Sequence, residues 1–305
     1  MTLSLIIPYH NEEKNILNTL NSIKTQLLLP KEVLLINSSS TDSTSDIINK
    51  FSKKNRQLNI QNLSANTKNP SDSKNYGILN SANELLAFMD CGIFFPENWL
   101  QECMKYNNDE NIDIISAPIK FNAKNTFDAS ATAQLWGYNS IHFVIPGSII
   151  KKEIFKKYGL FENRRAGYDL VWKRKIQRND VTVFILKNVN IRYDGYNIAE
   201  NIKNLFLKVF LYSNKSAKLK EYNKDKIYIY FSIIFFTSFL LNKSAGLILI
   251  VIYFLIRQLI FPIYKSKSIK VFTDYPKSFL IMFFVGFTID IARVTGYFKS
   301  YFYTN

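Results

Sequence analysis

The chain has 305 residues, more than one small domain needs, and carries 39 lysine and arginine residues against 24 aspartate and glutamate residues, for a formal net charge of +15. That charge indicates an anionic partner, which is a nucleic acid, a membrane surface or a phosphorylated substrate. Cys91 and Cys103 have no metal-binding spacing and fit a reducing compartment, so nothing calls for a disulfide framework. The N-terminus lacks the basic segment and apolar core of a signal peptide, and we expect none.

The first part of the chain alternates short apolar runs with helical patterns. Residues 3–7 form a continuous apolar run, which predicts a buried parallel strand. Asn11 predicts the start of a helix that continues to about Gln26. Further strands are expected at residues 33–36, 58–60 and 85–89, and further helices near residues 44–51 and 71–77. This alternation predicts an α/β fold with a parallel, doubly wound sheet.

An aspartate stands at the end of the fourth predicted strand. Asp90 follows the apolar run of residues 85–89 directly, and Cys91 and Gly92 come next. A carboxylate at the carboxyl end of a buried strand lies where open α/β sheets bind their ligands. The alternative is an aspartate that closes a turn, and both alternatives stay open on these residues alone.

Six short motifs occur in order over residues 3–195. They are Ile6-Ile7-Pro8-Tyr9-His10-Asn11-Glu12, Asn37-Ser38-Ser39-Ser40-Thr41-Asp42, Ser73-Lys74-Asn75-Tyr76-Gly77-Ile78, Asp90-Cys91-Gly92, the segment from Pro146-Gly147-Ser148 to Gly159-Leu160-Phe161, and Gly167-Tyr168-Asp169. In this order they resemble the motifs of inverting family-2 glycosyltransferases. The resemblance implies the GT-A fold, which is a Rossmann-like, mostly parallel sheet with flanking helices, and it implies a nucleotide-sugar donor.

The resemblance also implies a donor site on the loops that follow the first strands. Its expected residues are Pro8, Tyr9, Asn11, Asn37, Ser39, Lys74 and Asp90. Polar groups on the first two loops would bind the base and ribose, and Lys74 would neutralise a phosphate. Asn37 stands where the family usually has an aspartate. The alternatives are that Asn37 and residues 38–40 only cap the next helix, and that Lys74 is a solvated surface lysine.

A divalent metal ion, Mg²⁺ or Mn²⁺, is the cofactor that the resemblance implies. Asp90 stands at the first acid of the D-x-D motif, whereas Gly92 replaces the second acid, which is usually the main metal ligand. We therefore expect a weaker metal site at Asp90, or one that another group completes. His142 is a candidate for that group, or else an ordinary strand residue.

The last motif implies the acceptor side of the site. In the family its acid removes the proton of the acceptor hydroxyl, so Asp169 is the candidate general base. Tyr168 stands where the family usually has glutamate and is expected on the acceptor side with Gly167 and Trp172. Asp169 could instead only cap the helix at residues 170–177. The neighbouring basic residues either attract a phosphate or form a solvated face; they are Arg164, Arg165, Lys173, Arg174 and Lys175.

The end of the chain holds nearly all of the long apolar runs. Residues 227–241 and 246–264 predict a helical hairpin in the membrane, with flanking lysines that place both ends in the cytoplasm. Residues 278–298 are also apolar but contain Asp290 and Arg293, which lie one helical turn apart and can pair. For this stretch we favour an interfacial or re-entrant helix over a third span. Burial of the whole tail in a soluble core is the alternative, and its many apolar residues and few charges disfavour it.

These expectations divide the chain into a glycosyltransferase domain at residues 1–200, a basic connector at 201–226 and membrane-anchoring helices at 227–305. The predicted function is that of a membrane-anchored enzyme of polysaccharide biosynthesis with its catalytic domain on the cytoplasmic side. It would move a sugar from a nucleotide-sugar donor to a lipid-linked or cell-surface polysaccharide acceptor, and its partners would be these two substrates and membrane lipids.

Other functions remain as alternatives. A catalytically decayed transferase fold that binds nucleotide sugars or serves as a scaffold is one of them, because Asn37, Gly92 and Tyr168 depart from the family pattern. A nucleotidyltransferase would need a glycine-rich first loop, which the chain lacks. A nucleic-acid partner is not expected, because the basic residues cluster beside apolar runs and so point to lipid.

Overall fold

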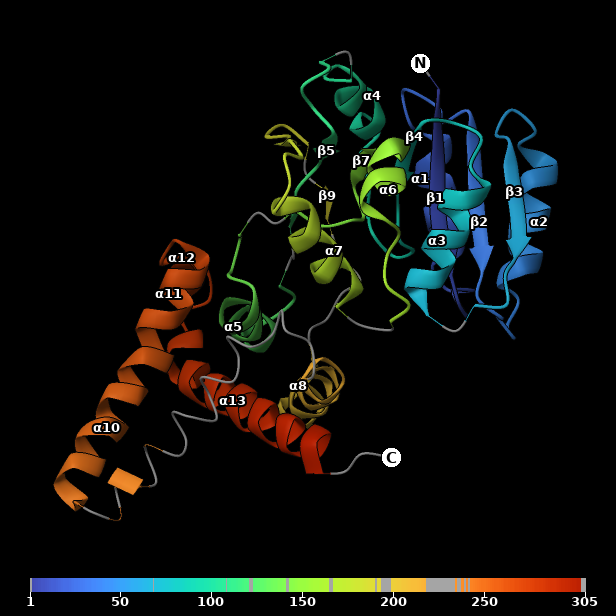
Figure 1. The fold of residues 1–305 in the computed structure, drawn as a ribbon. Helices are drawn as coiled ribbons and strands as arrows, with labels where there is room; N and C mark the ends of the chain where they lie inside the picture. Colours follow the sequence, from blue (N-terminus) through green and yellow to red (C-terminus); the bar gives the residue numbers. More distant parts are fainter. Residues whose placement is uncertain are drawn as a thin grey trace. The chain divides into compact units, whose positions relative to one another are not determined.

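The computed structural model (Figure 1) describes most of the chain and contains two compact units. The described residues are 2–67, 69–107, 109–120, 123–140, 143–164, 167–189, 191–192, 199–217, 234, 237–238, 240 and 242–302. Unit 1 contains Met1–Lys120 and Ile141–Gly195, and unit 2 contains Phe121–Ser140 and Tyr196–Asn305. Residues 121–140 thus group with the C-terminal helices, and the domain boundaries at residues 200 and 226 stay predictions.

The described residues of unit 1 form a seven-stranded sheet with the order β3-β2-β1-β4-β7-β5-β8. Its strands are β1 (Leu3–Tyr9), β2 (Glu32–Asn37), β3 (Ile60–Ser64), β4 (Leu85–Phe88), β5 (Ile114–Ser116), β7 (Ser148–Lys151) and β8 (Val183–Ile185). Strands β1 to β4 are parallel, as are β5 and β8, whereas β7 is antiparallel to both of its neighbours. A small second sheet pairs β6 (Ile119–Lys120) with β9 (Ile191–Arg192). The predicted α/β fold with a mostly parallel sheet is confirmed.

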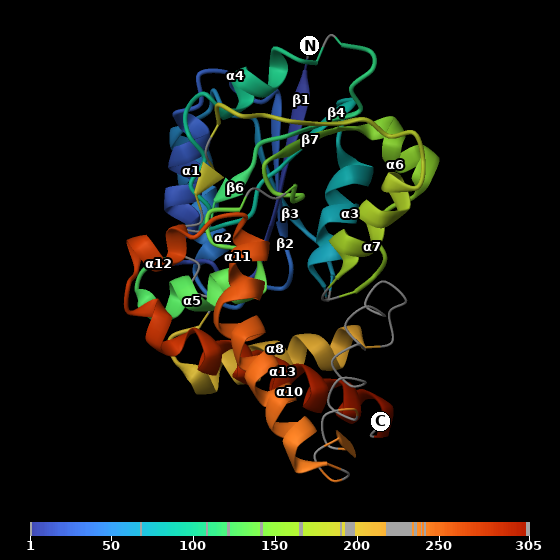
Figure 2. The same ribbon diagram turned by 90° about the vertical axis from the view of Figure 1, so that its left-hand side faces the viewer.

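Helices cover both faces of the large sheet. They are α1 (Ile16–Lys24), α2 (Thr44–Lys54), α3 (Pro70–Asn80), α4 (Trp99–Met104), α6 (Lys152–Tyr158) and α7 (Tyr168–Gln177). Figure 2 shows α1 and α2 on one face of the sheet and α3, α6 and α7 on the other. Because the central strands are buried on both faces, they read as continuous apolar runs; Ile6, Leu34 and Phe88 are fully buried in one core cluster.

The first helix begins later than the sequence predicted. Helix α1 starts at Ile16, and the prediction of a helix cap at Asn11 was wrong. Asn11 has a left-handed backbone with φ of 55°, and its side-chain oxygen accepts a hydrogen bond from the Thr41 N–H at 2.8 Å. The carbonyl of Glu12 accepts the N–H groups of Asn15 and Ile16, so turns connect β1 to α1. Asn11 therefore ties the first loop to the second loop.

The regular secondary structure of unit 2 is helical in the part that the structure describes. Its elements are α5 (Thr126–Leu135), α8 (Ile202–Ser216), α10 (Lys243–Leu255), the π-helix η2 (Ile256–Ile260), α11 (Phe261–Ser266), α12 (Lys270–Asp274) and α13 (Ser278–Phe302). The stretches Lys243–Ser266 and Ser278–Tyr301 are long and apolar enough to cross a membrane, judged by length and composition. The predicted apolar run at residues 227–241 lies largely outside the described residues.

A buried ion pair joins the two long apolar stretches of unit 2. Arg257, in η2, donates from Nε to Oδ2 of Asp290 at 2.6 Å, and the guanidinium is only 2% exposed. The predicted pairing of Asp290 with Arg293 is also present, at 3.9 Å. The shorter contact comes from a residue 33 positions away in the sequence, which helical spacing does not reveal.

Candidate active site

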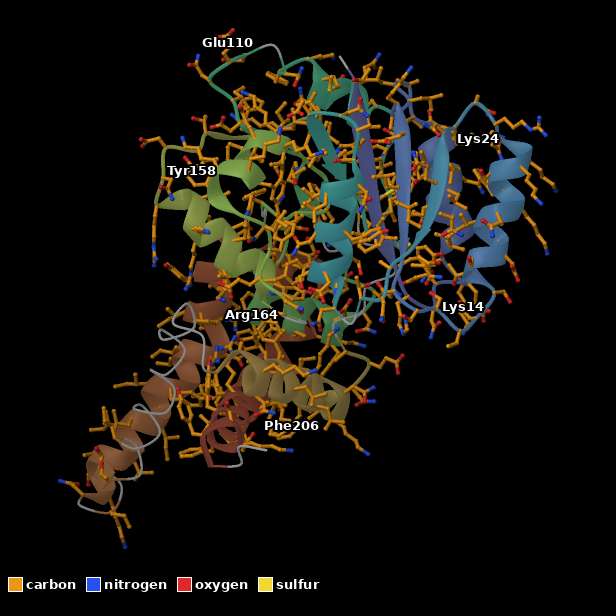
Figure 3. The ribbon with its side chains drawn as sticks, turned by 45° about the vertical axis from the view of Figure 1, so that its right-hand side comes forward. Lys14, Lys24, Glu110, Tyr158, Arg164 and Phe206 are labelled. Atoms are coloured by element: carbon orange, nitrogen blue, oxygen red, sulfur yellow. The ribbon has the colours of Figure 1, made fainter. Side chains whose placement is uncertain are left out.

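The loops at the carboxyl edge of the parallel strands bring the sequence motifs of unit 1 together. These loops follow β1, β2, β3 and β4, and ligands of open α/β sheets bind at this edge. Figure 3 shows Lys14 and Arg164 at this edge of unit 1, whereas Lys24 lies at the opposite edge. The hydroxyl of Ser71 at the start of α3 donates to the Arg164 carbonyl at 2.9 Å and accepts the Arg164 N–H at 3.0 Å. These bonds hold the loop before α7 against the start of α3.

Lys74, in the third motif, contacts one residue of the fourth motif and one of the sixth. Its Nζ lies 2.9 Å from Oδ1 of Asp90 and donates to the hydroxyl oxygen of Tyr168 at 3.0 Å. The side chain of Lys74 is 1% exposed, whereas that of Asp90 is 33% exposed. One buried ammonium group therefore links the aspartate after β4 to the residue directly before Asp169.

The surroundings of Lys74 favour its charged form. Burial opposes the charge and would lower the pKa, but the carboxylate of Asp90 and the oxygen of Tyr168 outweigh it and raise the pKa of Lys74 above its ordinary value. Burial raises the pKa of Tyr168, so this phenol stays protonated at neutral pH. The result is a lysine cation that carries its charge at physiological pH and whose nearest anion is Asp90.

Each polar or small residue of the helix α3 motif has a separate structural task. Asn75 forms two hydrogen bonds with the backbone of Phe161, donating to the carbonyl at 2.7 Å and accepting the N–H at 3.0 Å. Gly77 lies so close to β1 that a Cβ atom there would sit 2.5 Å from Cγ2 of Ile6. The motif thus places Lys74, holds the loop at Phe161 and lets α3 approach the sheet.

Asp169 lies in the first turn of α7 and faces solvent in part. Its side chain is 39% exposed, and Oδ2 lies 3.8 Å from Nζ of Lys173, one turn further along the helix. Burial lowers the pKa of Lys173, although the Asp169 carboxylate opposes that change. Gly167 precedes the helix in a left-handed conformation, with φ of 74°, which suits glycine. An accessible carboxylate in this position is free to meet a substrate hydroxyl.

Of the predicted donor residues on the first two loops, Asn11 joins one loop to the other. Asn37 accepts the N–H of Ser40 at 2.8 Å, so its side chain closes its own loop rather than capping α2. Ser39 is exposed and has a left-handed backbone with φ of 58°. Pro8 pairs with Ile36 inside the sheet.

Tyr9 is more deeply buried than the donor prediction assumed. It is 3% exposed, and its hydroxyl donates to Oδ1 of Asn62 on β3 at 2.6 Å. Burial raises the pKa of this phenol. The side chain of Tyr9 thus reaches from the end of β1 to β3, and its hydroxyl is already bonded.

Trp172 belongs to the core of unit 1. It is 2% exposed, stacks on Phe155 with ring centroids 4.8 Å apart, and donates from its indole nitrogen to the carbonyl of Gly159 at 2.9 Å. A buried ring with a bonded nitrogen offers no face to an acceptor sugar. Trp172 is therefore not part of the acceptor side of the proposed site.

Two side-chain contacts were not predicted from the motifs. The hydroxyls of Ser38 and Thr67 both contact the hydroxyl of Ser73, which joins the second loop to α3. Arg192, on β9, stacks its guanidinium over Phe94 at 4.4 Å, just beyond the loop of Asp90 and Gly92. A hydroxyl or a lone arginine far along the sequence is too common to predict a site, and only the fold places them together.

Asp90 is the residue of this edge that is expected to hold a divalent ion. A carboxylate oxygen is the ligand type that Mg²⁺ and Mn²⁺ prefer, and Asp90 is partly exposed. Gly92 brings no ligand and has a left-handed φ of 78°. Among the described residues no group of three His, Cys, Asp or Glu side chains gathers as a metal cluster. His142 lies outside the described residues. Asp90 alone thus fits an ion whose other ligands come from a bound diphosphate and water.

The comparisons with known proteins identify the family. The profile described as Glycosyl transferase family 2 matches residues 4–161. The chain belongs to this family.

Two curated proteins are similar to parts of the chain. Glycosyltransferase AglE of Haloferax volcanii is 28% identical over 162 residues, which are 52% of this chain and 51% of AglE. Poly(ribitol-phosphate) beta-N-acetylglucosaminyltransferase TarS of Staphylococcus aureus is 22% identical over 247 residues, which are 74% of this chain and 43% of TarS. The chain therefore spans about half the length of the curated relatives that it matches.

Solved structures show the same fold. The crystal structure of S. aureus TarS 1-349 in complex with UDP-GlcNAc has a TM-score of 0.52 at 17% identity and covers 98% of this chain and 91% of that chain. The mannosyltransferase of Pyrobaculum calidifontis in complex with GDP-Man and Mn²⁺ has a TM-score of 0.59 at 14% identity, with 98% and 86% covered. The GT-A fold implied by the sequence motifs is confirmed.

Proposed function

We propose that this chain is a membrane-attached, inverting glycosyltransferase that moves a sugar from a nucleotide-sugar donor to a lipid-linked or cell-surface polysaccharide acceptor. Family membership supports the reaction class. The observation that carries the site is the contact of Lys74 with both Asp90 and Tyr168, the residue before Asp169. Through it, the acid expected at the donor is joined to the residue directly before the acid expected at the acceptor.

In the proposed reaction, the acceptor hydroxyl oxygen attacks the anomeric carbon of the donor sugar while Asp169 accepts the hydroxyl proton. The bond between the anomeric carbon and the diphosphate oxygen breaks, and its electron pair leaves with the nucleoside diphosphate. Attack from the face opposite the leaving group inverts the configuration at that carbon. Asp169 suits the role of base because its carboxylate is partly exposed at the start of α7.

The donor class rests on the relatives. TarS binds UDP-GlcNAc and the mannosyltransferase binds GDP-Man with Mn²⁺, so a nucleoside diphosphate sugar is the donor we propose here. Asp90 would hold a divalent ion if one accompanies the diphosphate, and that ion would neutralise charge on the leaving phosphates. Lys74 is sealed behind Asp90 and Tyr168, so we assign it to holding Asp90 rather than to touching a phosphate.

Membrane attachment rests on unit 2. Its two long apolar helices support insertion into lipid, and Leu247, Ile248 and Val251 on α10 are more than half exposed. Lysines follow the apolar stretch of α10 to α11 at Lys265, Lys267 and Lys270, which supports a cytoplasmic location for this end. An acceptor that is itself held at the membrane would then lie within reach of the site.

A binding screen tests the donor site. Purified chain is titrated with UDP-sugars and GDP-sugars, with and without Mg²⁺ or Mn²⁺, and binding is measured by calorimetry. We expect at least one donor to bind, and Asp90→Ala to weaken that binding about tenfold because a charged ligand to ribose or metal is lost. Affinity and metal dependence that are unchanged in Asp90→Ala would remove Asp90 from the site.

An assay of donor transfer and hydrolysis, run with the same nucleotide sugars, separates the proposal from its rival. A scaffold on a decayed transferase fold would bind a nucleotide sugar but neither transfer nor hydrolyse it. Binding without turnover of any donor would therefore favour the scaffold, whereas turnover would exclude it.

A further inference from the structure

The two long apolar helices of unit 2 do not share one direction. Figures 1 and 2 both show α10 projecting away from the other helices of unit 2, while α13 runs past α5 and beside α8. Helices that diverge in this way cannot both follow the normal of one bilayer. At least one of them is therefore tilted away from that normal.

The junction from which they diverge is fixed by buried polar contacts. Besides its pair with Asp290, Arg257 donates from Nη1 to Oε1 of Gln134 on α5 at 3.0 Å. Gln134 in turn donates to the carbonyl of Met282 on α13 at 3.2 Å. Tyr253 of α10 donates to Asp290 at 2.9 Å. These bonds hold α10, α5 and α13 against one another at one junction, so contacts within unit 2 fix the different directions of α10 and α13.

Helix α13 has one covered face and one apolar, uncovered face. On the covered face, Val285, Ile289 and Ala292 pack with residues of α5 and α8. The exposed residues of the other face are Phe279, Leu280, Phe284, Phe287, Ile291, Phe298 and Tyr301. Most follow one another at intervals of three, four or seven positions, so they form a single stripe along the helix. An apolar stripe of this length indicates contact with hydrocarbon rather than with water.

Helix α8 accompanies α13 over the middle and the end of its length. Leu205 and Val209 meet the middle of α13, and a Cβ atom added to Gly296 would lie 2.7 Å from the carbonyl oxygen of Phe210. Tyr301 donates to the carbonyl of Ala217 at 3.3 Å. Any depth that α13 reaches in a bilayer is therefore reached by α8 as well.

The composition of α8 does not suit the interior of a bilayer. It carries Lys203, Lys208 and Lys215 on exposed positions, and its 15 residues are too few to cross the hydrocarbon. The same exposed side holds Leu207 and Leu211 among the lysines. Lysines interleaved with leucines suit the boundary between headgroups and acyl chains, where the ammonium groups meet lipid phosphates.

We propose that α13 lies in the plane of the membrane surface. Its apolar stripe would lie in the outer part of the hydrocarbon, and α8 beside it at the level of the headgroups. The occupant of the stripe is a phospholipid bilayer, and α10 is the part that enters it. The inference rests on the proposed membrane attachment. It excludes α13 as a second span.

Depth measurements at three positions of the stripe test this orientation. Phe284→Cys, Ile291→Cys and Phe298→Cys are each labelled with an environment-sensitive fluorophore in the full chain. The chain is then placed in vesicles of phosphatidylcholine and phosphatidylglycerol in equal parts. Lipids brominated at shallow or deep acyl positions quench the label according to its depth. Cys91 and Cys103 are buried, and labelled wild type measures their background.

The orientation decides the pattern of quenching. The three positions are seven residues apart, so about 10 Å separates each from the next along the axis. In the plane, all three labels give the same quenching ratio and are quenched best by the shallow bromines. Leu247→Cys on α10 serves as the inserted control and is quenched more strongly by the deep bromines.

Three other results would overturn the inference. A label at 291 that lies deepest, with 284 and 298 shallow on opposite sides, would show that α13 spans the bilayer. Labels at all three positions that no lipid quenches, in a chain that crosslinks to a second copy, would show that the stripe is a protein interface. A chain that does not float with the vesicles would instead refute the membrane attachment itself.

Discussion

At the scale of single residues, the site of unit 1 depends on one buried lysine. The ammonium group of Lys74 pairs with the Asp90 carboxylate and donates to the Tyr168 hydroxyl, so both of these groups contact one cation. Asp90 remains exposed enough to meet a ligand because the lysine approaches it from the protein side. The sequence motifs named these three residues but suggested a phosphate contact for Lys74, because the burial of a lysine among such neighbours is not visible in a linear pattern.

Replacing the lysine tests this arrangement. Lys74→Met should lower the free energy of unfolding by about 2 kcal/mol, because it leaves Asp90 without its cation and Tyr168 without its donor. Urea unfolding measures the change. The double variant Lys74→Met with Asp90→Asn should recover part of the loss, since the unpaired charge is gone. Equal stability of the wild type and Lys74→Met would show that the contact contributes nothing.

The exposed acids and the loops were only partly predictable from the sequence. Asp169 stands in the first turn of α7. Both hypotheses, a catalytic base and a residue that only caps the helix, place it there, so its position alone does not decide between them. Asn11 was expected to cap a helix and instead joins two loops, because its side chain finds the Thr41 N–H across 30 positions of sequence. Long-range partners of this kind are decided by the fold.

At the scale of elements, the parallel strands were the most predictable part. Continuous apolar runs at β1, β2 and β4 specify strands buried on both faces, and each was found within a residue or two of its expected place. The weak run at residues 58–60 gave β3 only approximately, because its side chains are half-buried and polar residues interrupt it. The antiparallel direction of β7 had no local signal, since pairing direction depends on how the chain returns to the sheet.

Helix α3 shows how packing sets a sequence requirement. Gly77→Val should lower the free energy of unfolding by about 2 kcal/mol, because the added side chain collides with Ile6 of β1. Chemical denaturation of the variant measures the cost. Leu79→Ala, on the same helix at a position 67% exposed, is the matched control and should change stability by less than about 0.5 kcal/mol. A Gly77→Val variant as stable as the wild type would mean that α3 can shift away from the sheet.

At the scale of the whole molecule, unit 2 contains more than a C-terminal tail. It includes residues 121–140, which the sequence order places between β6 and β7 of unit 1. Composition revealed the apolar helices but not this membership, because α5 is a short helix with an unremarkable pattern. The charge of +15 is interpretable only with its distribution, since lysines beside apolar runs favour lipid over nucleic acid as the proposed partner.

The ion pair within unit 2 should be essential to its folding. Arg257→Met removes the main partner of the buried Asp290 and should cost about 3 kcal/mol of stability, seen as a lower thermal midpoint in detergent. Arg293→Met removes the longer contact to Asp290, at 3.9 Å, and should cost less than about 1 kcal/mol. If the two variants melted at the same temperature, Asp290 would not depend on Arg257.

The most direct test of the proposed function is the turnover of a labelled nucleotide sugar by the wild type and by Asp169→Asn. Asp180→Asn, at an exposed position in the turn after α7, is the surface control. Both the wild type and the control should consume the donor at the same rate. The Asp169→Asn variant should bind the donor with unchanged affinity but turn it over at least about a hundredfold more slowly, because the acceptor hydroxyl has lost its base. Turnover by Asp169→Asn at the wild-type rate would contradict the assignment of the catalytic base.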